Sequence, residues 1–166
     1  MSGDGVVAVP VVGERDAGPG GRTSRWVHVN RRLAANPAAV YRAWTDPGQL
    51  VRWLPFSVDG SLEAGGRAVL GWPDGSTWWE MIRAVPDREV SFRWPSLKDE
   101  SWRTVVTVRI HRERSATLVS LEDGPYDLTV PRVLDAYAEA CGRWATAMTQ
   151  LRGCLDFGVD LREPAT

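Results

Sequence analysis

The sequence has little cysteine, little histidine and almost no lysine. Its 166 residues include two cysteines, two histidines and, among 20 basic residues, a single lysine, Lys98. Cys141 and Cys154 stand in one stretch of helical periodicity, which would hold them roughly 20 Å apart, far beyond the reach of a disulfide. We therefore expect two reduced thiols in a cytoplasmic protein, with no metal site and no cofactor.

Long hydrophobic runs and a large net charge are also absent. No apolar run approaches about 18 residues, so no membrane-spanning helix is expected. The N-terminus has no basic segment before its apolar stretch, which argues against a signal peptide. The formal net charge is −1, which argues against nucleic acid as a partner and against a polybasic membrane anchor. The arginine bias suggests a GC-rich bacterial genome.

Tryptophan is the residue in excess, with 9 Trp against 3 Tyr and 3 Phe. A buried tryptophan supplies a large flat apolar surface and one N–H donor. The excess predicts a large core, a cavity lined with aromatic rings, or both.

The first 24 residues differ from the rest of the chain. Six glycines and two prolines fall in this span, which has no regular period, so residues 1–24 are predicted to be a flexible tail. The length suits one domain, which we expect to begin at Arg25 and to cover residues 25–162.

Local patterns predict an order of elements for this domain. Alternation predicts a first strand over 25–33, and Asn36-Pro37 and Asp46-Pro47 are cap signals for two short helices, the second carrying Leu50, Trp53 and Leu54. Turn signals then separate six more strands, expected at 58–62, 67–72, 77–85, 89–94, 102–112 and around 117–121.

The chain ends in the clearest helical period. A helix over about 131–155 is predicted to bury one apolar stripe: Leu134, Tyr137, Cys141, Trp144, Met148, Leu151 and Leu155. Gly142 falls inside it, either because something approaches closely or because it is tolerated. The order predicts an α+β fold in which a curved seven-stranded antiparallel sheet grips the long helix and leaves a space beneath it.

These landmarks resemble the START/Bet v1-like helix-grip (SRPBCC) superfamily, and most of all the bacterial AHSA1-like homologues of the Hsp90 ATPase activator. The resemblance covers residues 25–162 and is carried by Arg31-Arg32-Leu33-Ala34-Ala35-Asn36-Pro37, Val40-Tyr41-Arg42-Ala43-Trp44-Thr45-Asp46-Pro47, Leu50, Trp53, Trp144 and Asp160-Leu161-Arg162. The chain departs from the family at Arg143, because the family has glycine directly before that tryptophan.

The resemblance implies a binding function more directly than a reaction. Members hold lipids, polyketides and other large apolar molecules between sheet and helix, and some from enediyne antibiotic producers are linked to self-resistance. We therefore expect a monomer or weak homodimer that binds a sizeable apolar or aromatic molecule, such as a natural product of polyketide type. The alternatives are a polyketide cyclase or dehydratase and an Hsp90-type chaperone partner.

The expected ligand contacts are aromatic and soft apolar side chains on the strands and the last helix. They are Trp53, Trp72, Trp79, Met81, Phe92, Trp94, Trp102, Tyr137, Cys141, Trp144 and Met148. Trp78 and Trp79 must point to opposite faces, and the pattern leaves open which of them lines the space.

Catalytic motifs are not recognised in the sequence. A cyclase would need an acid or base inside the space, and the candidates are Arg31, Glu80 and Tyr137, with Glu122 as a further carboxylate. Arg31 continues the face of Val27 and Val29, so it points inward or turns to solvent at the strand end. Both histidines, His28 and His111, are predicted to face solvent, and Cys141 is predicted to be an inert buried thiol.

Overall fold

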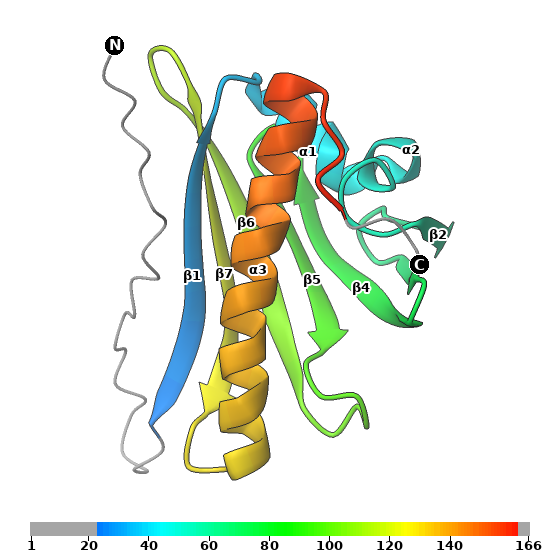
Figure 1. The fold of residues 1–166 in the computed structure, drawn as a ribbon, viewed down its shortest axis with the longest axis vertical. Coiled ribbons are helices and arrows are strands. Elements are labelled where there is room, and N and C mark those ends of the chain that lie inside the picture. The colour runs from blue at the N-terminus through cyan, green and yellow to red at the C-terminus, as the bar shows by residue number, and fades with distance from the viewer. Residues whose placement is uncertain (1–22, 163–166) are drawn as a thin grey trace.

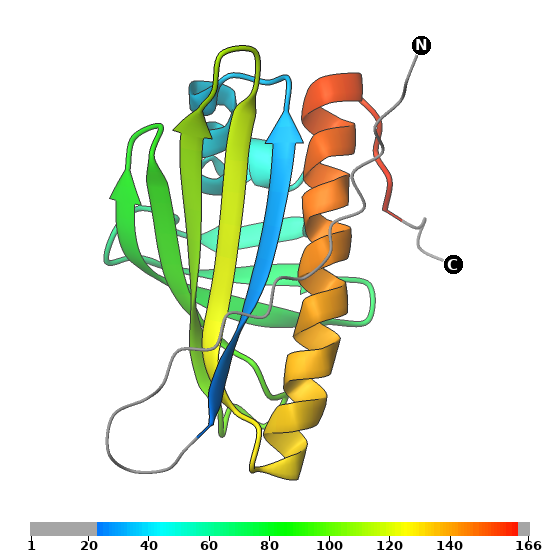
Figure 2. The ribbon, with the colours of Figure 1, turned by 90° about the vertical axis from the view of Figure 1, so that its left-hand side faces the viewer.

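The sheet places its first and last strands side by side. The computed structural model describes residues 23–162, whose seven strands form one antiparallel sheet in the order β1-β7-β6-β5-β4-β3-β2. The strands are β1 (Ser24–Leu33), β2 (Ser57–Gly60), β3 (Arg67–Trp72), β4 (Gly75–Val85), β5 (Glu89–Pro95), β6 (Arg103–Arg112) and β7 (Thr117–Asp127). The sheet curves around one side of the long helix α3 (Pro131–Phe157) (Figures 1 and 2), so the predicted helix-grip fold is confirmed. The predicted tail lies outside the described residues, apart from residues 23 and 24.

The two short helices begin at the predicted caps. Asn36 Oδ1 accepts a hydrogen bond from Ala39 N at the start of α1 (Pro37–Thr45), and Asp46 Oδ1 accepts one from Gly48 N at the start of α2 (Pro47–Leu50). The second helix is shorter than predicted and ends before Trp53. Pro55 disfavours helical geometry in the residue before it, so the buried Trp53 and Leu54 lie in a turn and loop.

The last strand is longer than the alternation of Thr117, Val119 and Leu121 indicated. It continues to Asp127, because Asp123 occupies the next inward position as a buried polar residue. An aspartate does not register in an apolar pattern, so the predicted strand stopped too early.

The buried face of α3 differs from the predicted stripe, and this prediction is corrected. The residues buried in the first half of the helix include Val133, Ala136 and Ala140, whereas Leu134 is 45% exposed. Tyr137, Cys141 and Leu155 are half-buried. Small alanine side chains let the helix lie close to β1 and β7 and rotate the larger residues toward its margin.

Gly142 has open space around it. A Cβ atom built there meets nothing within 4 Å. No neighbouring backbone therefore explains this glycine in the described structure.

The two faces of the sheet have opposite character. A row of ion pairs crosses the outer face: His28 to Glu122 at 3.5 Å, Glu122 to Arg109 at 2.7 Å, Arg109 to Glu89 at 3.6 Å, and Glu89 to Arg83 at 3.4 Å. The inner face is apolar and packs against α1 and α3. The core, and with it the expected ligand site, therefore lies between the sheet and the helices.

Candidate ligand site between the sheet and the C-terminal helix

Six aromatic side chains meet between the sheet and the helices. Trp44 on α1 lies at the centre of this aromatic cluster, with its ring centroid 4.8 Å from Trp53, 6.1 Å from Trp79, 6.4 Å from Phe92 and 6.4 Å from Trp144.

Two further ring contacts extend the aromatic cluster. Trp79 and Phe92 stack at 3.9 Å, and Trp94 lies edge-on to Trp144 at 5.3 Å. All six rings are almost fully buried, so in this structure they fill the centre of the predicted space.

The predicted ligand contacts divide into two groups by burial. Seven belong to the buried core: Trp53, Trp79, Met81, Phe92, Trp94, Trp144 and Met148. Four are half-buried against it: Trp72, Trp102, Tyr137 and Cys141. The structure thus brings most of the set together, with the second group at the margin.

The question left open by alternation on β4 is resolved. Trp79 and Met81 are buried in the core. Trp78 lies on the outer face, where the guanidinium groups of Arg67 and Arg103 sit 4.5 and 5.2 Å from its ring and its Nε1 donates to Glu100.

A buried carboxyl group, Asp123 on β7, adjoins the aromatic cluster. Its Oδ2 accepts hydrogen bonds from Tyr126 Oη at 2.7 Å and Trp144 Nε1 at 2.8 Å, and its Oδ1 accepts them from Trp94 Nε1 at 3.2 Å and Thr104 Oγ1. Burial raises the pKa of Asp123 above its usual range, and the four donors oppose that shift. We call these five residues the Asp123 network.

The Asp123 network links three strands to α3. Trp94, Thr104 and Asp123 come from β5, β6 and β7, and Trp144 comes from the helix. Sequence reasoning weighed the neighbouring Glu122 and missed Asp123. The strand alternation does contain a signal for Asp123. Alternate residues of a strand face the same side of the sheet, and Asp123 follows Val119 and Leu121 at intervals of two on the inward face.

Trp44 carries an unpaired donor inside the aromatic cluster. Its Nε1–H is buried and has no hydrogen-bond partner in the protein. Water cannot pair with it either, because the side chain is completely inaccessible to solvent. Six other indoles do donate: Trp53, Trp72, Trp78, Trp94, Trp102 and Trp144. Buried polar groups are almost always paired, so this donor requires an explanation.

The half-buried margin of the site lies along the first half of α3. The ring of Tyr137 is 5.6 Å from that of Tyr126, and Trp102 Nε1 donates to the Pro125 carbonyl at 3.1 Å. Burial raises the pKa of Tyr137 and that of the Cys141 thiol. A raised pKa keeps Cys141 a neutral thiol, in agreement with its predicted inertness.

The candidate acids and bases lie in different places. Arg31 is half-buried and reaches across to α3, where it donates to the exposed Thr149 Oγ1 at 2.8 Å. Glu80 pairs with Arg93 at 2.8 Å on the outer face, as does Glu122 with Arg109 and His28. Glu80 and Glu122 therefore cannot act inside the space, because alternation along their strands turns them away from it. His111 is exposed.

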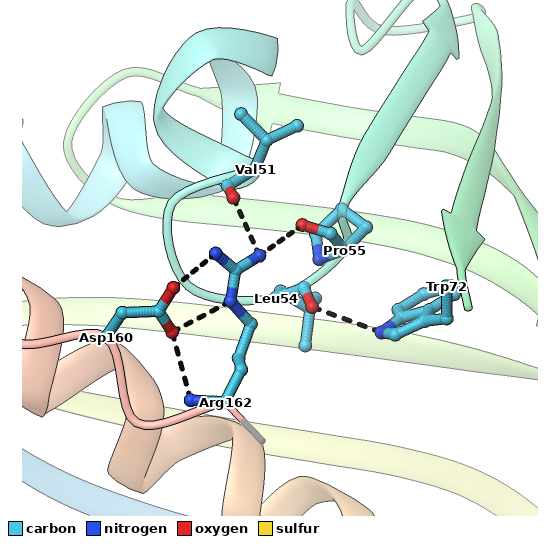
Figure 3. A network of polar contacts seen from close by, with 6 residues as sticks. All are labelled: Val51, Leu54, Pro55, Trp72, Asp160 and Arg162. Atoms are coloured by element: carbon cyan, nitrogen blue, oxygen red, sulfur yellow. Dashed lines mark hydrogen bonds and ion pairs between the residues drawn. The ribbon is translucent and has the colours of Figure 1, made fainter. Parts of the chain in front are cut away.

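A strap after α3 is hydrogen-bonded to the loop that follows α2 (Figure 3). In this C-terminal strap, residues 158–162, the Arg162 guanidinium donates to the Val51 carbonyl at 2.8 Å and the Pro55 carbonyl at 2.7 Å, and Asp160 accepts from it at 2.6 Å. Trp72 Nε1 donates to the Leu54 carbonyl in the same loop at 3.1 Å. Side chains from elsewhere thus hold the loop that carries Trp53.

Two negative findings apply to residues 23–162. No group of three histidine, cysteine or acidic side chains is placed to hold a metal ion there. Nor is any helix in that part of the chain both long enough and apolar enough to cross a membrane.

Comparison with protein families gives one match over most of the domain. A family model described as activator of Hsp90 ATPase homolog 1-like protein matches residues 34–156. No curated protein matches the chain significantly.

Solved structures with the same fold include proteins from bacteria. CalU16 from Micromonospora echinospora aligns with a TM-score of 0.69 and 23% identity over 88% of this chain and 82% of that chain. DynU16, a protein in the dynemicin biosynthetic locus, aligns with a TM-score of 0.72 and 21% identity over 83% of this chain and 49% of that one. Aha1 from Colwellia psychrerythraea, solved as a dimer, aligns with a TM-score of 0.68 and 20% identity over 80% and 98% of the two chains.

Proposed function

Because the chain belongs to the family of activator of Hsp90 ATPase homolog 1-like proteins, we propose that it binds a sizeable apolar or aromatic small molecule between its sheet and α3. The ligand is a flat molecule that stacks against the aromatic cluster and bears a hydrogen-bond acceptor.

The unpaired Nε1–H of Trp44 is the observation that carries this proposal. A buried donor without a partner destabilises the folded state by about 1–3 kcal/mol. A carbonyl or ether oxygen of a bound molecule would pair with this donor and remove that penalty. The unliganded protein therefore holds a site that favours an oxygen-bearing ligand over a pure hydrocarbon.

The aromatic cluster supports a ring-shaped ligand. An offset-stacked or edge-to-face ring pair contributes about 0.5–1.5 kcal/mol beyond its buried area. The rings now fill their space with one another, so a ligand has to separate α3 from the sheet and replace ring-to-ring contacts with its own. The half-buried Trp102, Tyr137 and Cys141 mark the margin at which such a separation begins.

A natural product of polyketide type meets these requirements, because it combines fused rings with carbonyl and hydroxyl oxygens. The likeness of fold to CalU16 and to a protein of the dynemicin biosynthetic locus supports this choice of ligand class. In its narrowest form the proposal is self-resistance to an enediyne, by sequestration of the toxic product.

Fluorescence titration tests the proposal with a matched pair of neutral probes. 9-Fluorenone and fluorene have the same three-ring frame and differ by one carbonyl oxygen. We expect both probes and neutral aromatic polyketides to change tryptophan emission saturably, with fluorenone binding about tenfold more tightly, as one recovered hydrogen bond predicts. In Trp44→Phe the preference for fluorenone should vanish while fluorene binding persists.

Each outcome has a distinct meaning. If no aromatic probe or polyketide changes the emission, the binding function is wrong. If the probes bind and the carbonyl makes no difference, the role of Trp44 is wrong. For the self-resistance form, exposure to an activated enediyne that leaves the chain intact and added DNA unprotected would contradict it.

A further inference from the structure

A groove lies outside the core, at the end of the sheet where α1 begins. It has a volume of about 910 Å³ and is lined by the start of α1, the turn between β4 and β5, and the end of β6. Small-molecule sites have volumes of about 300–1,000 Å³. The groove is thus large enough for a ligand, and it shares no lining residue with the aromatic cluster.

The lining of this groove is strongly basic. It contains four arginines, Arg83, Arg88, Arg109 and Arg112, and two carboxylates, Asp87 and Glu89, which leaves an excess of two positive charges with His111 neutral. The chain as a whole has a net charge of −1. The positive charge is therefore a local property of this groove, which we call the arginine groove.

The four arginines are not equivalent. Glu89 lies 3.4 Å from Arg83 and 3.6 Å from Arg109, and Arg109 also pairs with Glu122. Arg88 and Arg112 are exposed, and within residues 23–162 no side chain pairs with either of them. Each guanidinium offers a planar fork of donors that matches a carboxylate or phosphate group.

The backbone beneath these two arginines is fixed. The Arg88 carbonyl accepts a hydrogen bond from Ile110 N at 2.8 Å, and Arg88 N donates to the Val85 carbonyl at 3.0 Å. The first of these bonds ties the turn to β6, two residues before Arg112, and the second closes the turn itself. Val85, Ile110 and Pro37 add apolar surface to the lining, so an anion is not the only group that the groove can contact.

We propose that the arginine groove is a second binding site, which takes a small organic anion: a carboxylate or phosphate ester joined to a short apolar body. Arg88 and Arg112 hold the anionic group, and the apolar part of the lining contacts the body. This site is independent of the ligand proposed for the aromatic cluster and uses none of its residues.

NMR titration of the full-length chain tests this site with four probes. Phenyl phosphate and benzoate carry an aromatic body and an anion, inorganic phosphate lacks the body, and benzyl alcohol lacks the charge. We expect phenyl phosphate or benzoate to cause saturable shifts at the backbone amides of residues 85, 87–89 and 109–112, with weaker effects from inorganic phosphate and none from benzyl alcohol. The stronger of the two aromatic anions identifies the anionic group.

Paired variants separate specific binding from general attraction of anions. The double variant Arg88→Gln/Arg112→Gln should weaken the stronger probe at least tenfold, while Arg52→Gln/Arg143→Gln, which removes the same charge outside the groove, should leave it unchanged. Equal weakening in both, or shifts scattered over the surface, would overturn the proposal. Shifts confined to the indole N–H signals would overturn it as well and would assign the probe to the aromatic cluster.

Discussion

Substitution of Asp123 by asparagine or by alanine tests which donors of the Asp123 network have a second hydrogen-bond acceptor. Asparagine keeps the shape of the side chain and exchanges one acceptor oxygen for an NH₂ group. On Oδ2 both Tyr126 and Trp144 need an acceptor. On Oδ1 the donor Trp94 also lies 3.0 Å from Thr104 Oγ1, which gives that indole a second acceptor. The amide is therefore expected to place its oxygen toward Trp144 and its NH₂ toward Thr104.

The magnitudes follow from this arrangement. Asp123→Asn should lower the free energy of unfolding by about 1 kcal/mol, because Trp94 retains Thr104 and the Thr104 hydroxyl can donate to Ser96, 2.6 Å away. Asp123→Ala leaves Trp144 Nε1 and Tyr126 Oη buried without an acceptor and opens a cavity. Its cost should be about 4 kcal/mol.

Urea unfolding at neutral pH measures both changes, and a double-mutant cycle tests the cause. Thr104→Val removes the second acceptor of Trp94, so its cost should be larger in the Asp123→Asn background than in the natural chain. The indole N–H resonance of Trp144 should stay at its position in Asp123→Asn, whereas that of Trp94 moves. The reasoning is refuted if asparagine costs as much as alanine, or if the two substitutions are additive.

Three further predictions concern pH, the C-terminal strap and Cys141. Burial raises the pKa of Asp123 above its ordinary value of 3.8, so between pH 3.8 and the raised pKa the folded state binds more protons than the unfolded state. The free energy of unfolding should therefore fall as pH rises through this range. A pH series of urea melts on Asp123→Asn should lack that slope. Arg162→Ala frees the carbonyls of Val51 and Pro55, so amide exchange at residues 51–54 and 56 should accelerate. The control is Arg152→Ala, because Arg152 pairs with Asp156 and lies over the ring of Phe157 at the end of α3, and it should leave this exchange unchanged. Equal exchange in both variants would contradict the holding role of Arg162. The raised pKa of the Cys141 thiol should make its reaction with a disulfide reagent at pH 8 slower in the folded chain than in urea, and equal rates would be inconsistent with its burial.

Local signals in the sequence were sufficient for most of the fold. The Asn36-Pro37 and Asp46-Pro47 pairs mark where α1 and α2 begin, because capping and the fixed φ of proline act within one turn of the chain. Turn residues likewise place β3 at 67–72, as the structure has it. These features depend on neighbours in sequence, so no knowledge of tertiary packing was needed.

Properties of the site that depend on packing were harder to read. The rotation of α3 follows from Ala136 and Ala140, which a pattern weighted toward large apolar residues passes over. Asp123 was missed because an aspartate can be buried in the core only when donors satisfy its oxygens, and its four donors come from separate elements. The unpaired Trp44 N–H can be recognised only when the positions of all its neighbours are known. Glu80 was assigned correctly by alternation to the face opposite Trp79, but which face is inward is a tertiary property.

The attachments of α3 are unevenly distributed along its length, and this bears on how a ligand could enter. Toward its C-terminus, Asp156 accepts from the backbone N–H groups of Ala34 and Ala35 at 2.9 and 3.0 Å, and Arg31 donates to Thr149. The charged contact of the first turn is the exposed pair between Arg132 and Asp99, which contributes at most about 1 kcal/mol.

Between these ends, Trp144 is bound to the buried Asp123, so the network sits near the middle of the helix. Movement of the first half would uncover Tyr137 and Cys141 before it disturbs Asp123, and it would separate ring from ring in the aromatic cluster only when the Trp144 bond also breaks. A ligand that pairs with Trp44 and stacks on the exposed rings compensates for that broken bond, whereas a hydrocarbon of the same shape compensates only for the lost stacking. Under the proposed function, the polar groups of the site would therefore determine which molecules can keep the helix open, and the tryptophan rings would determine the shape that those molecules must have.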